Sequence, residues 1–156
     1  MSPPLAFTLN GAPATIGPDE TLLDALRERL GATEVKAGCA IGRCGACTVL
    51  LDGAAVNACL LSGWQVAGRA ITTIAGLAAL PVGETFAAAM EEENAFQCGY
   101  CAPGMMMTLA GLLSVRPLPD DARLSEALEG NLCRCTGYHS ILRGARTARD
   151  RLKDKP

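Results

Sequence analysis

The segment GCAIGRCGACTVLLDG, residues 38–53, constrains the fold of this chain more than any other. Its three cysteines have the spacing C-x4-C-x2-C, and a fourth cysteine follows the third after eleven residues. The cysteine loop runs into the apolar stretch TVLL, residues 48–51, which is typical of a strand that ends at the turn Asp52-Gly53. The four cysteines are Cys39, Cys44, Cys47 and Cys59.

This spacing is that of a plant-type 2Fe-2S site. Three thiolates on one tight loop can converge on two irons, and a fourth from a different segment closes the cage. Gly38, Gly42 and Gly45 allow the loop to curl, so that backbone N–H groups can point at the sulfurs. The sequence therefore predicts a four-cysteine iron-sulfur site in the first half of the chain.

A second group of four cysteines lies in the other half of the chain. Here a C-x2-C pair is followed after 31 residues by a C-x-C pair. The first pair stands just before a helix that Pro103 begins, and the second stands in a turn before the last helix. Both pairs are thus expected at helix N-termini, where the helix dipole favours thiolate charge. These cysteines are Cys98, Cys101, Cys133 and Cys135.

Two other uses of eight cysteines are open at this point. Four disulfides would require an oxidising compartment, and the sequence shows no targeting segment that would direct the chain to one. Structural zinc also takes four thiolates, usually from two short knuckles with two to four residues between the cysteines. The three-plus-one spacing of the first group favours iron-sulfur over zinc, whereas the spacing of the second group favours neither strongly.

The composition of the chain argues against two classes of binding partner. Fourteen Lys and Arg against sixteen Asp and Glu leave no positive surplus for nucleic acid or an anionic membrane. With 49% apolar and 19% charged residues, the chain is expected to fold and to expose apolar surface that associates readily with other surfaces. The start, residues 1–11, does not resemble an export signal, so a cytoplasmic location is expected. The uncharged residues 94–115 are broken by polar residues, Gly and Pro, which indicates a bundle helix rather than a membrane span.

The remaining periodicity divides the chain in two. A hairpin of strands 5–9 and 14–16 around Asn10-Gly11, a helix over residues 21–30 capped by Asp19 or Thr21, and strands 48–51 and 70–74 predict a small α+β unit. Helices over residues 83–94, 103–115, 123–131 and 140–153 predict a four-helix bundle. We place the two domains at residues 1–76 and 77–156.

Three strings carry a family resemblance. They are GCAIGRCGACTVLLDG (residues 38–53), QCGYCAPGMMM (97–107) and GNLCRCTGYHSI (130–141). They resemble the small iron-sulfur subunit of the xanthine oxidase family of molybdenum hydroxylases, including the small subunits of aerobic carbon monoxide dehydrogenase and 4-hydroxybenzoyl-CoA reductase. The resemblance takes in all eight cysteines; Ala40, Ile41 and Ala102 depart from the common pattern without touching a ligand position.

The resemblance implies an N-terminal β-grasp, plant-type ferredoxin-like domain and a C-terminal helical-bundle domain, each with one 2Fe-2S cluster. It also implies a large partner subunit that holds a molybdopterin-type cofactor, and commonly a medium partner that holds FAD. This chain would carry electrons between them. By the same resemblance, Gln97 contacts the pterin cofactor, and Cys135 lies beside the pterin as well as binding iron.

No residue of this chain is expected to be catalytic. The only histidine, His139, cannot supply a His-activated nucleophile by itself and follows Tyr138 in a helix-entry turn, where a surface role is expected. Gln97 precedes Cys98 and either has a polar partner outside the fold or caps the Cys98 loop. The chain is thus expected to be the iron-sulfur subunit of an oxidoreductase complex. The alternative is a free ferredoxin-like carrier or a zinc-stabilised interaction module.

Overall fold

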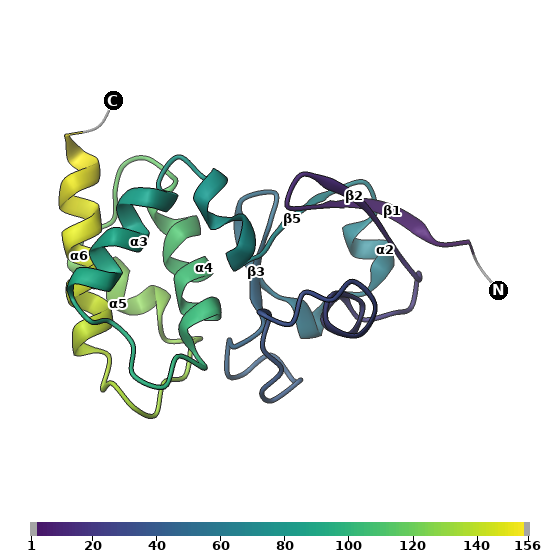
Figure 1. Cartoon of the computed structure of the whole chain (residues 1–156), viewed down its shortest axis with the longest axis horizontal. Helices are drawn as coiled ribbons and strands as arrows, with labels where there is room; N and C mark the ends of the chain where they lie inside the picture. Colours follow the sequence, from purple (N-terminus) through teal and green to yellow (C-terminus); the bar gives the residue numbers. More distant parts are fainter. Residues whose placement is uncertain (1–2, 155–156) are drawn as a thin grey trace.

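A computed structural model describes residues 3–154 of the chain. Two lobes lie side by side, a lobe built on a β-sheet and a lobe built of helices (Figure 1). Strand β1 (Leu5–Leu9) lies at one end of the long axis and helix α6 (His139–Lys153) lies at the other. The apolar core is divided in the same way, with one cluster of buried side chains in each lobe.

The first lobe contains a five-stranded sheet with the order β2-β1-β5-β3-β4. Strand β1 pairs antiparallel with β2 and parallel with β5, while β3 pairs antiparallel with β4 and β5. The predicted hairpin is confirmed, with Asn10 and Gly11 at positive φ in its turn. The other strands are β2 (Ala12–Ile16), β3 (Thr48–Leu51), β4 (Ala54–Asn57) and β5 (Ala70–Thr72).

Three strands differ from the sequence prediction. Strand β2 begins at Ala12 rather than at residue 14, because its pairing with β1 extends to Leu9 opposite Ala12. Strand β4, with the sequence AAVN, lacks the alternation of a half-buried strand, and it forms because the turn at Asp52 and Gly53 folds the chain back along β3. Strand β5 ends at Thr72 rather than at residue 74, because the chain turns there into the 3-10 helix η3 (Ile74–Ala79). The Asn10 side chain holds this turn by accepting the Thr73 N–H at 2.9 Å.

One helical segment packs against the sheet. Helix α1 (Leu22–Asp24) continues into a π-helical turn, η1 (Ala25–Arg29), and its cap is Thr21, whose Oγ1 accepts the Asp24 N–H at 3.1 Å. The parallel pair β1-β5, with this segment packed against the sheet, is the expected β-grasp arrangement. Two further short elements, η2 (Ala58–Leu60) and α2 (Gly63–Val66), link β4 to β5. Fully buried side chains join helix and sheet, namely Leu22, Leu26, Ile16, Val49 and Ile71.

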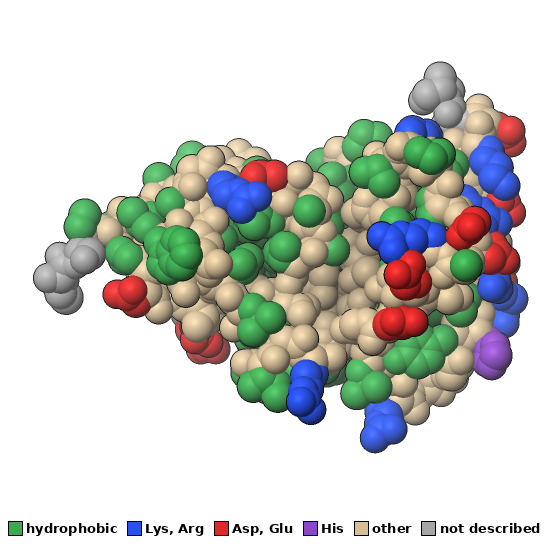
Figure 2. All heavy atoms as spheres, turned by 180° about the vertical axis from the view of Figure 1, so that it is seen from behind, with side chains coloured by type: hydrophobic (Ala, Val, Ile, Leu, Met, Phe, Trp, Pro, Cys, Tyr) green, Lys and Arg blue, Asp and Glu red, His purple; other side chains and the backbone are tan. Residues whose placement is uncertain are grey.

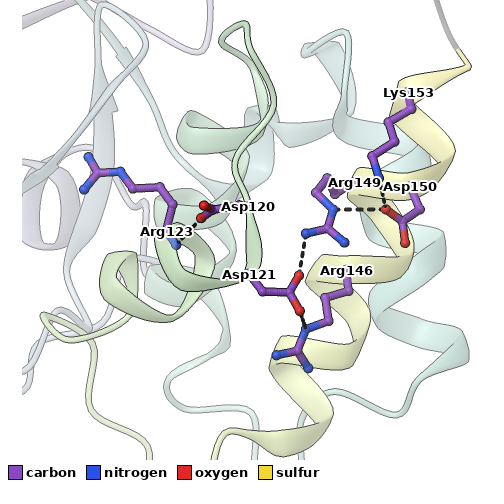
Figure 3. Close-up of polar contacts among 7 residues, drawn as sticks. All are labelled: Asp120, Asp121, Arg123, Arg146, Arg149, Asp150 and Lys153. Carbon is purple, nitrogen blue, oxygen red and sulfur yellow. Dashed lines mark hydrogen bonds and ion pairs between the residues drawn. The ribbon is translucent and has the colours of Figure 1, made fainter.

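The second lobe contains the four predicted helices. They are α3 (Gly83–Glu92), α4 (Ala102–Leu113), α5 (Asp121–Ala127) and α6 (His139–Lys153). Helix α5 begins two residues earlier than the predicted start at residue 123, because the Asp120 carboxylate accepts the Arg123 N–H at 2.8 Å and caps it (Figure 3). It ends at Ala127 rather than at residue 131, and the chain continues to the buried Asn131.

Ion pairs hold the outer helix α6 to its neighbours. The Asp121 carboxylate lies between Arg146 and Arg149 (Figure 3). Its oxygens are 2.9 Å from Arg146 Nε and 2.5 Å from Arg149 Nη1, so these ion pairs connect the start of α5 to α6. Arg149 also reaches Asp150, which accepts from Lys153. The charged side chains of α6 therefore pair within the helical lobe.

Helix α4 joins the two lobes by packing on strands β3 and β4. The approach is close, because a Cβ added to Gly104 would collide with the Gly45 carbonyl oxygen of the first cysteine loop. A Cβ on Gly111 would lie 2.9 Å from the Leu50 side chain. Glycines on one face of α4 thus set the distance between the lobes.

The predicted division after residue 76 falls within η3 and stays a prediction. Among the helices of residues 3–154, none is long and apolar enough to cross a membrane. The predicted cytoplasmic location likewise stays a prediction.

Candidate metal centres

The first cysteine loop curls around the Cys39 sulfur. Ala40, Gly42 and Gly45 have positive φ angles of 55°, 76° and 69°, which bend the backbone back on itself. As a result, three backbone N–H groups donate to Cys39 Sγ, from Ile41 at 3.5 Å, Arg43 at 3.2 Å and Cys44 at 3.3 Å. The expected backbone donors are thus present, although one of the bends is made by alanine.

These donors favour the charged form of the sulfur. The backbone N–H groups of Ile41, Cys44 and Arg43 lower the pKa of Cys39 to about 6. The sulfurs of Cys39 and Cys44 lie together, because each accepts the backbone N–H of the other residue at 3.3 Å. Cys39 is therefore prepared to bind metal as a thiolate.

The other two cysteines of the first group form a deeper pair. Burial raises the pKa of Cys47 to about 11, and the adjacent Cys59 thiol contributes to the shift. Cys47 is buried at the start of β3 and Cys59 is half-buried in η2. The loop supplies three sulfurs and η2 the fourth, which is the predicted three-plus-one arrangement.

The second group also consists of two pairs. Cys98 Sγ lies 3.5 Å from Cys135 Sγ, and both residues are exposed. Cys101 and Cys133 are in contact beneath them; burial raises the pKa of Cys101 to about 12. Burial acts to raise the pKa of Cys133 as well, but hydrogen bonds, first from the Thr136 hydroxyl at 3.1 Å, lower it to about 7.

Only one of these pairs stands at a helix N-terminus as predicted. Cys101 is the N-cap residue of α4, with Pro103 in the first turn. The C-x-C pair instead lies in the loop before α6 and is held by Tyr138, whose hydroxyl accepts the Cys133 N–H at 3.0 Å and donates to the Asn131 carbonyl at 2.8 Å. Tyr138 itself has φ 66°, which turns the chain into α6.

The loops that carry the two cysteine groups are bonded to each other across the lobes. The Leu132 N–H donates to the Cys44 carbonyl at 2.8 Å, so that a ligand residue of one group is one hydrogen bond from the neighbour of Cys133. Asn131 Nδ2 donates to the Gly45 carbonyl at 3.1 Å. The Tyr100 hydroxyl, within the C-x2-C pair, donates to the Ala37 carbonyl at 2.5 Å.

A cavity of about 220 Å³ opens between the two loops. Sulfur-bearing residues of both groups line it, together with the apolar side chains of Ala46, Tyr100 and Leu132. The remaining lining residues are Gly38, Cys44, Cys98, Cys101, Cys133, Arg134 and Cys135.

The donor set fits two 2Fe-2S clusters. A Cβ on Gly38 would lie 2.6 Å from the Cys44 sulfur, so any residue other than glycine at this position would clash with the sulfur. Within residues 3–154, no three His, Cys, Asp or Glu side chains are close enough together to hold one metal ion. The sulfurs stand as pairs, and a binuclear cluster takes two thiolates on each iron.

The residues with other predicted roles lie outside these pairs. Gln97 is exposed, and its side-chain amide has no hydrogen-bond partner among the residues the structure describes, so it does not cap the Cys98 loop. His139 is exposed at the start of α6, away from the cavity lining. Asn131, Tyr100 and Tyr138 bind the loops together and were not singled out from the sequence, although each stands within three residues of a cysteine.

Together, the folds and the paired thiols define a two-domain iron-sulfur protein. The model of the 2Fe-2S iron-sulfur cluster binding domain matches residues 7–70, and the model of the 2Fe-2S binding domain matches residues 73–146. The first domain is accordingly ferredoxin-like, and the second is the helical 2Fe-2S domain. The predicted α+β class is confirmed.

Relatives specify the family further. The chain is 43% identical to the nicotinate dehydrogenase small FeS subunit of Eubacterium barkeri, over 93% of this chain and 94% of that protein. It is 42% identical to the nicotine 6-hydroxylase small subunit of Paenarthrobacter nicotinovorans, over 94% and 90%. The crystal structure of quinoline 2-oxidoreductase from Pseudomonas putida 86 superposes with a TM-score of 0.84 at 36% identity, covering 97% of this chain and 96% of the matched chain.

The chain belongs to the small 2Fe-2S subunits of the xanthine oxidase family of molybdenum hydroxylases. It is a subunit of an oxidoreductase complex with two 2Fe-2S domains, which implies a role in electron transfer and a large partner subunit.

Proposed function

We propose that this chain transfers electrons between a molybdopterin site on a large subunit and FAD, or another acceptor, on a further partner. The observation that carries the proposal is the 2.8 Å hydrogen bond from the Leu132 N–H to the Cys44 carbonyl. It joins the two four-cysteine groups by a continuous backbone path, which a pair of unrelated metal sites would not need.

The ligands we propose are the eight cysteines in their two groups. Each 2Fe-2S cluster, when bound, accepts and releases one electron without a change in its ligands. The chain's own residues hold the sulfurs, supply N–H and O–H donors that stabilise thiolate charge, and bury one cysteine of each inner pair, Cys47 and Cys133. The groups are Cys39, Cys44, Cys47 and Cys59, and Cys98, Cys101, Cys133 and Cys135.

We place the second group next to the molybdopterin. Cys98 and Cys135 are the two exposed cysteines of the chain, and the free amide of Gln97 stands directly before Cys98. An amide that finds no partner within the described part of its own chain is available to a polar cofactor edge. Gln97 and Cys135 would then contact the pterin, and the first group would face the FAD partner.

The metal content of the purified complex tests the proposal. Two distinct 2Fe-2S signals in the EPR spectrum of the reduced complex are expected, together with a co-purifying molybdenum subunit. A colourless chain with stoichiometric zinc would support the zinc-stabilised module instead. A stable monomer that holds both clusters and turns over as a diffusible donor would support the free carrier.

The assigned order has its own test. Gln97→Ala should lower the molybdenum content of the purified complex and leave both 2Fe-2S signals in place. Gln65→Ala is a matched control, because the Gln65 side chain accepts the Ser62 N–H at 2.9 Å and caps α2, far along the chain from the second group. A structure of the complex with the pterin beside the first group would overturn the order.

A further inference from the structure

The arginines of this chain fall into two classes. Nearly all of them donate to a carboxylate or to a backbone carbonyl, as Arg149 does to Asp121 and Arg27 does to Val35. Only Arg43 and Arg134 have no side-chain partner within residues 3–154, and both are exposed. The arginines with partners are Arg27, Arg29, Arg69, Arg116, Arg123, Arg143, Arg146, Arg149 and Arg151.

The two unpartnered arginines are the two that stand inside the cysteine motifs. Arg43 directly precedes Cys44, and its own N–H donates to Cys39 Sγ at 3.2 Å. Arg134 separates Cys133 from Cys135 and lines the cavity between the loops together with the sulfur-bearing residues. Each four-cysteine group therefore has one guanidinium group of its own.

Carboxylates are missing from the same regions. No Asp or Glu occurs in residues 35–51, 95–119 or 130–149, and none lines the cavity. Acidic side chains instead gather over the helical lobe, where Figure 2 shows them beside cationic ones. At the lower edge of Figure 2, cationic side chains stand without acidic neighbours. The charge around the cysteine loops thus has one sign.

We propose that Arg43 and Arg134 act as electrostatic positioning residues that raise the reduction potentials of the first and second 2Fe-2S clusters, respectively. The inference rests on the proposed function, because it requires a cluster in each group. A cluster held by four thiolates is anionic, and one added electron makes it more so without breaking a bond. A nearby cation stabilises the reduced form more than the oxidised form.

The absence of a carboxylate partner is what makes these charges effective. An arginine in an ion pair presents a dipole whose field falls off quickly, whereas an unpaired guanidinium acts at full charge. Ala46, Tyr100 and Leu132 line the cavity between the loops, and their apolar surface takes the place of part of the water that would screen the charges.

The test is an EPR-monitored redox titration of the purified complex, which follows the two cluster signals separately. Arg134→Gln should make the second cluster roughly threefold to tenfold harder to reduce, where tenfold corresponds to about 59 mV for one electron. The first cluster should keep its potential. Arg43→Gln should lower the potential of the first cluster and leave that of the second unchanged. Arg134→Lys keeps the positive charge and should therefore keep most of the wild-type potential of the second cluster.

Arg123→Gln is the matched control, because it removes one exposed arginine that pairs with Glu126 at 2.6 Å outside the cysteine loops. It should leave both potentials unchanged. The Arg134→Gln shift should also shrink as salt is raised, since an exposed charge is screened.

Three results would overturn the inference. Unchanged potentials in both glutamine variants would do so, as would an equal shift in Arg123→Gln, which would reveal only a net-charge effect. Loss of subunit association in Arg134→Gln at unchanged potentials would make the arginine a docking residue instead. If the wild-type complex shows no 2Fe-2S signals at all, the proposed function itself fails. That outcome differs from failure of the arginine inference, in which both signals are present but their potentials do not respond to the arginine variants.

Discussion

Replacing Asn131 by alanine should loosen the contact between the two cysteine loops. Asn131 is 5% exposed, and its side chain spans the lobes: Nδ2 donates to the Gly45 carbonyl at 3.1 Å, and Oδ1 accepts the Thr108 hydroxyl at 2.9 Å. Both partners keep a bond in the variant, because the Gly45 carbonyl still accepts from the Thr48 hydroxyl and the single proton of the Thr108 hydroxyl can turn to the Gly104 carbonyl at 3.1 Å.

The expected magnitude follows from these contacts. Two hydrogen bonds between neutral groups contribute about 2 kcal/mol, and no buried group is left without a partner. The volume lost from a buried site adds a fraction more, for a total of about 2–3 kcal/mol. That free energy corresponds to a roughly 30- to 150-fold change in a local opening equilibrium.

The Leu132 amide is the sensor for this opening, because its N–H crosses the lobes to the Cys44 carbonyl. Hydrogen exchange of this amide, followed by mass spectrometry with fragmentation to single residues, should accelerate by that factor in Asn131→Ala. Asn131→Asp should accelerate it further, since a carboxylate oxygen would face the Gly45 carbonyl in a buried site.

Asn57→Ala supplies the control. Asn57 also makes two side-chain bonds, to the Gly42 carbonyl and from the Thr48 hydroxyl, both at 3.2 Å, but all of its partners lie in the first lobe. It should leave the exchange of the Leu132 amide unchanged. Equal rates in Asn131→Ala and wild type, or equal acceleration in both alanine variants, would refute the reasoning that Asn131 joins the loops.

Three further outcomes are expected. Cys47→Ser in the complex should remove one 2Fe-2S EPR signal and spare the other; loss of both from a folded protein would show that the groups are not independent. Gly104→Ala should destabilise the chain by about 1–3 kcal/mol in denaturant unfolding, since its methyl group would collide with a backbone oxygen of the other lobe, whereas Gly130→Ala, with open space around it, should cost much less. Asp121→Asn should lower the melting temperature at pH 7, and the difference from wild type should shrink as the pH falls below about 4 and vanish once the pH is below the folded-state pKa. The sign follows because the hydrogen bond from Arg149 lowers the pKa of Asp121, so its stabilisation is complete above the unfolded-state pKa and is lost as the pH falls through the folded-state value. A difference that persists at acid pH would contradict this assignment.

The local pattern of the sequence was sufficient to predict most of the helices and strands. Alternation and a two-residue turn predicted the β1-β2 hairpin, and apolar residues at helical spacing predicted the four helices of the second lobe. These features depend on residues a few positions apart, whose hydrogen bonds and exposed faces are fixed by the backbone geometry. The predictions failed at β4, at the start of β2, at the end of β5 and at both ends of α5, where strand pairing, a turn or a single capping carboxylate outweighed the local pattern.

Cysteine spacing by itself also indicated two groups of four cysteines and favoured iron-sulfur chemistry for the first, because a plant-type cluster demands thiolates at particular chain separations. For the second group the spacing favoured neither iron-sulfur nor zinc, and the family resemblance supplied the cluster. Only the tertiary structure decided how the groups meet. Asn131 and Gly45 are separated by 86 residues, and Tyr100 and Ala37 by 63, so no periodic pattern links them. Which arginines lack a partner depends equally on which carboxylates the fold brings near. Such contacts arise from the packing of α4 on β3, and packing between distant segments is a property of the folded chain rather than of any one stretch of it.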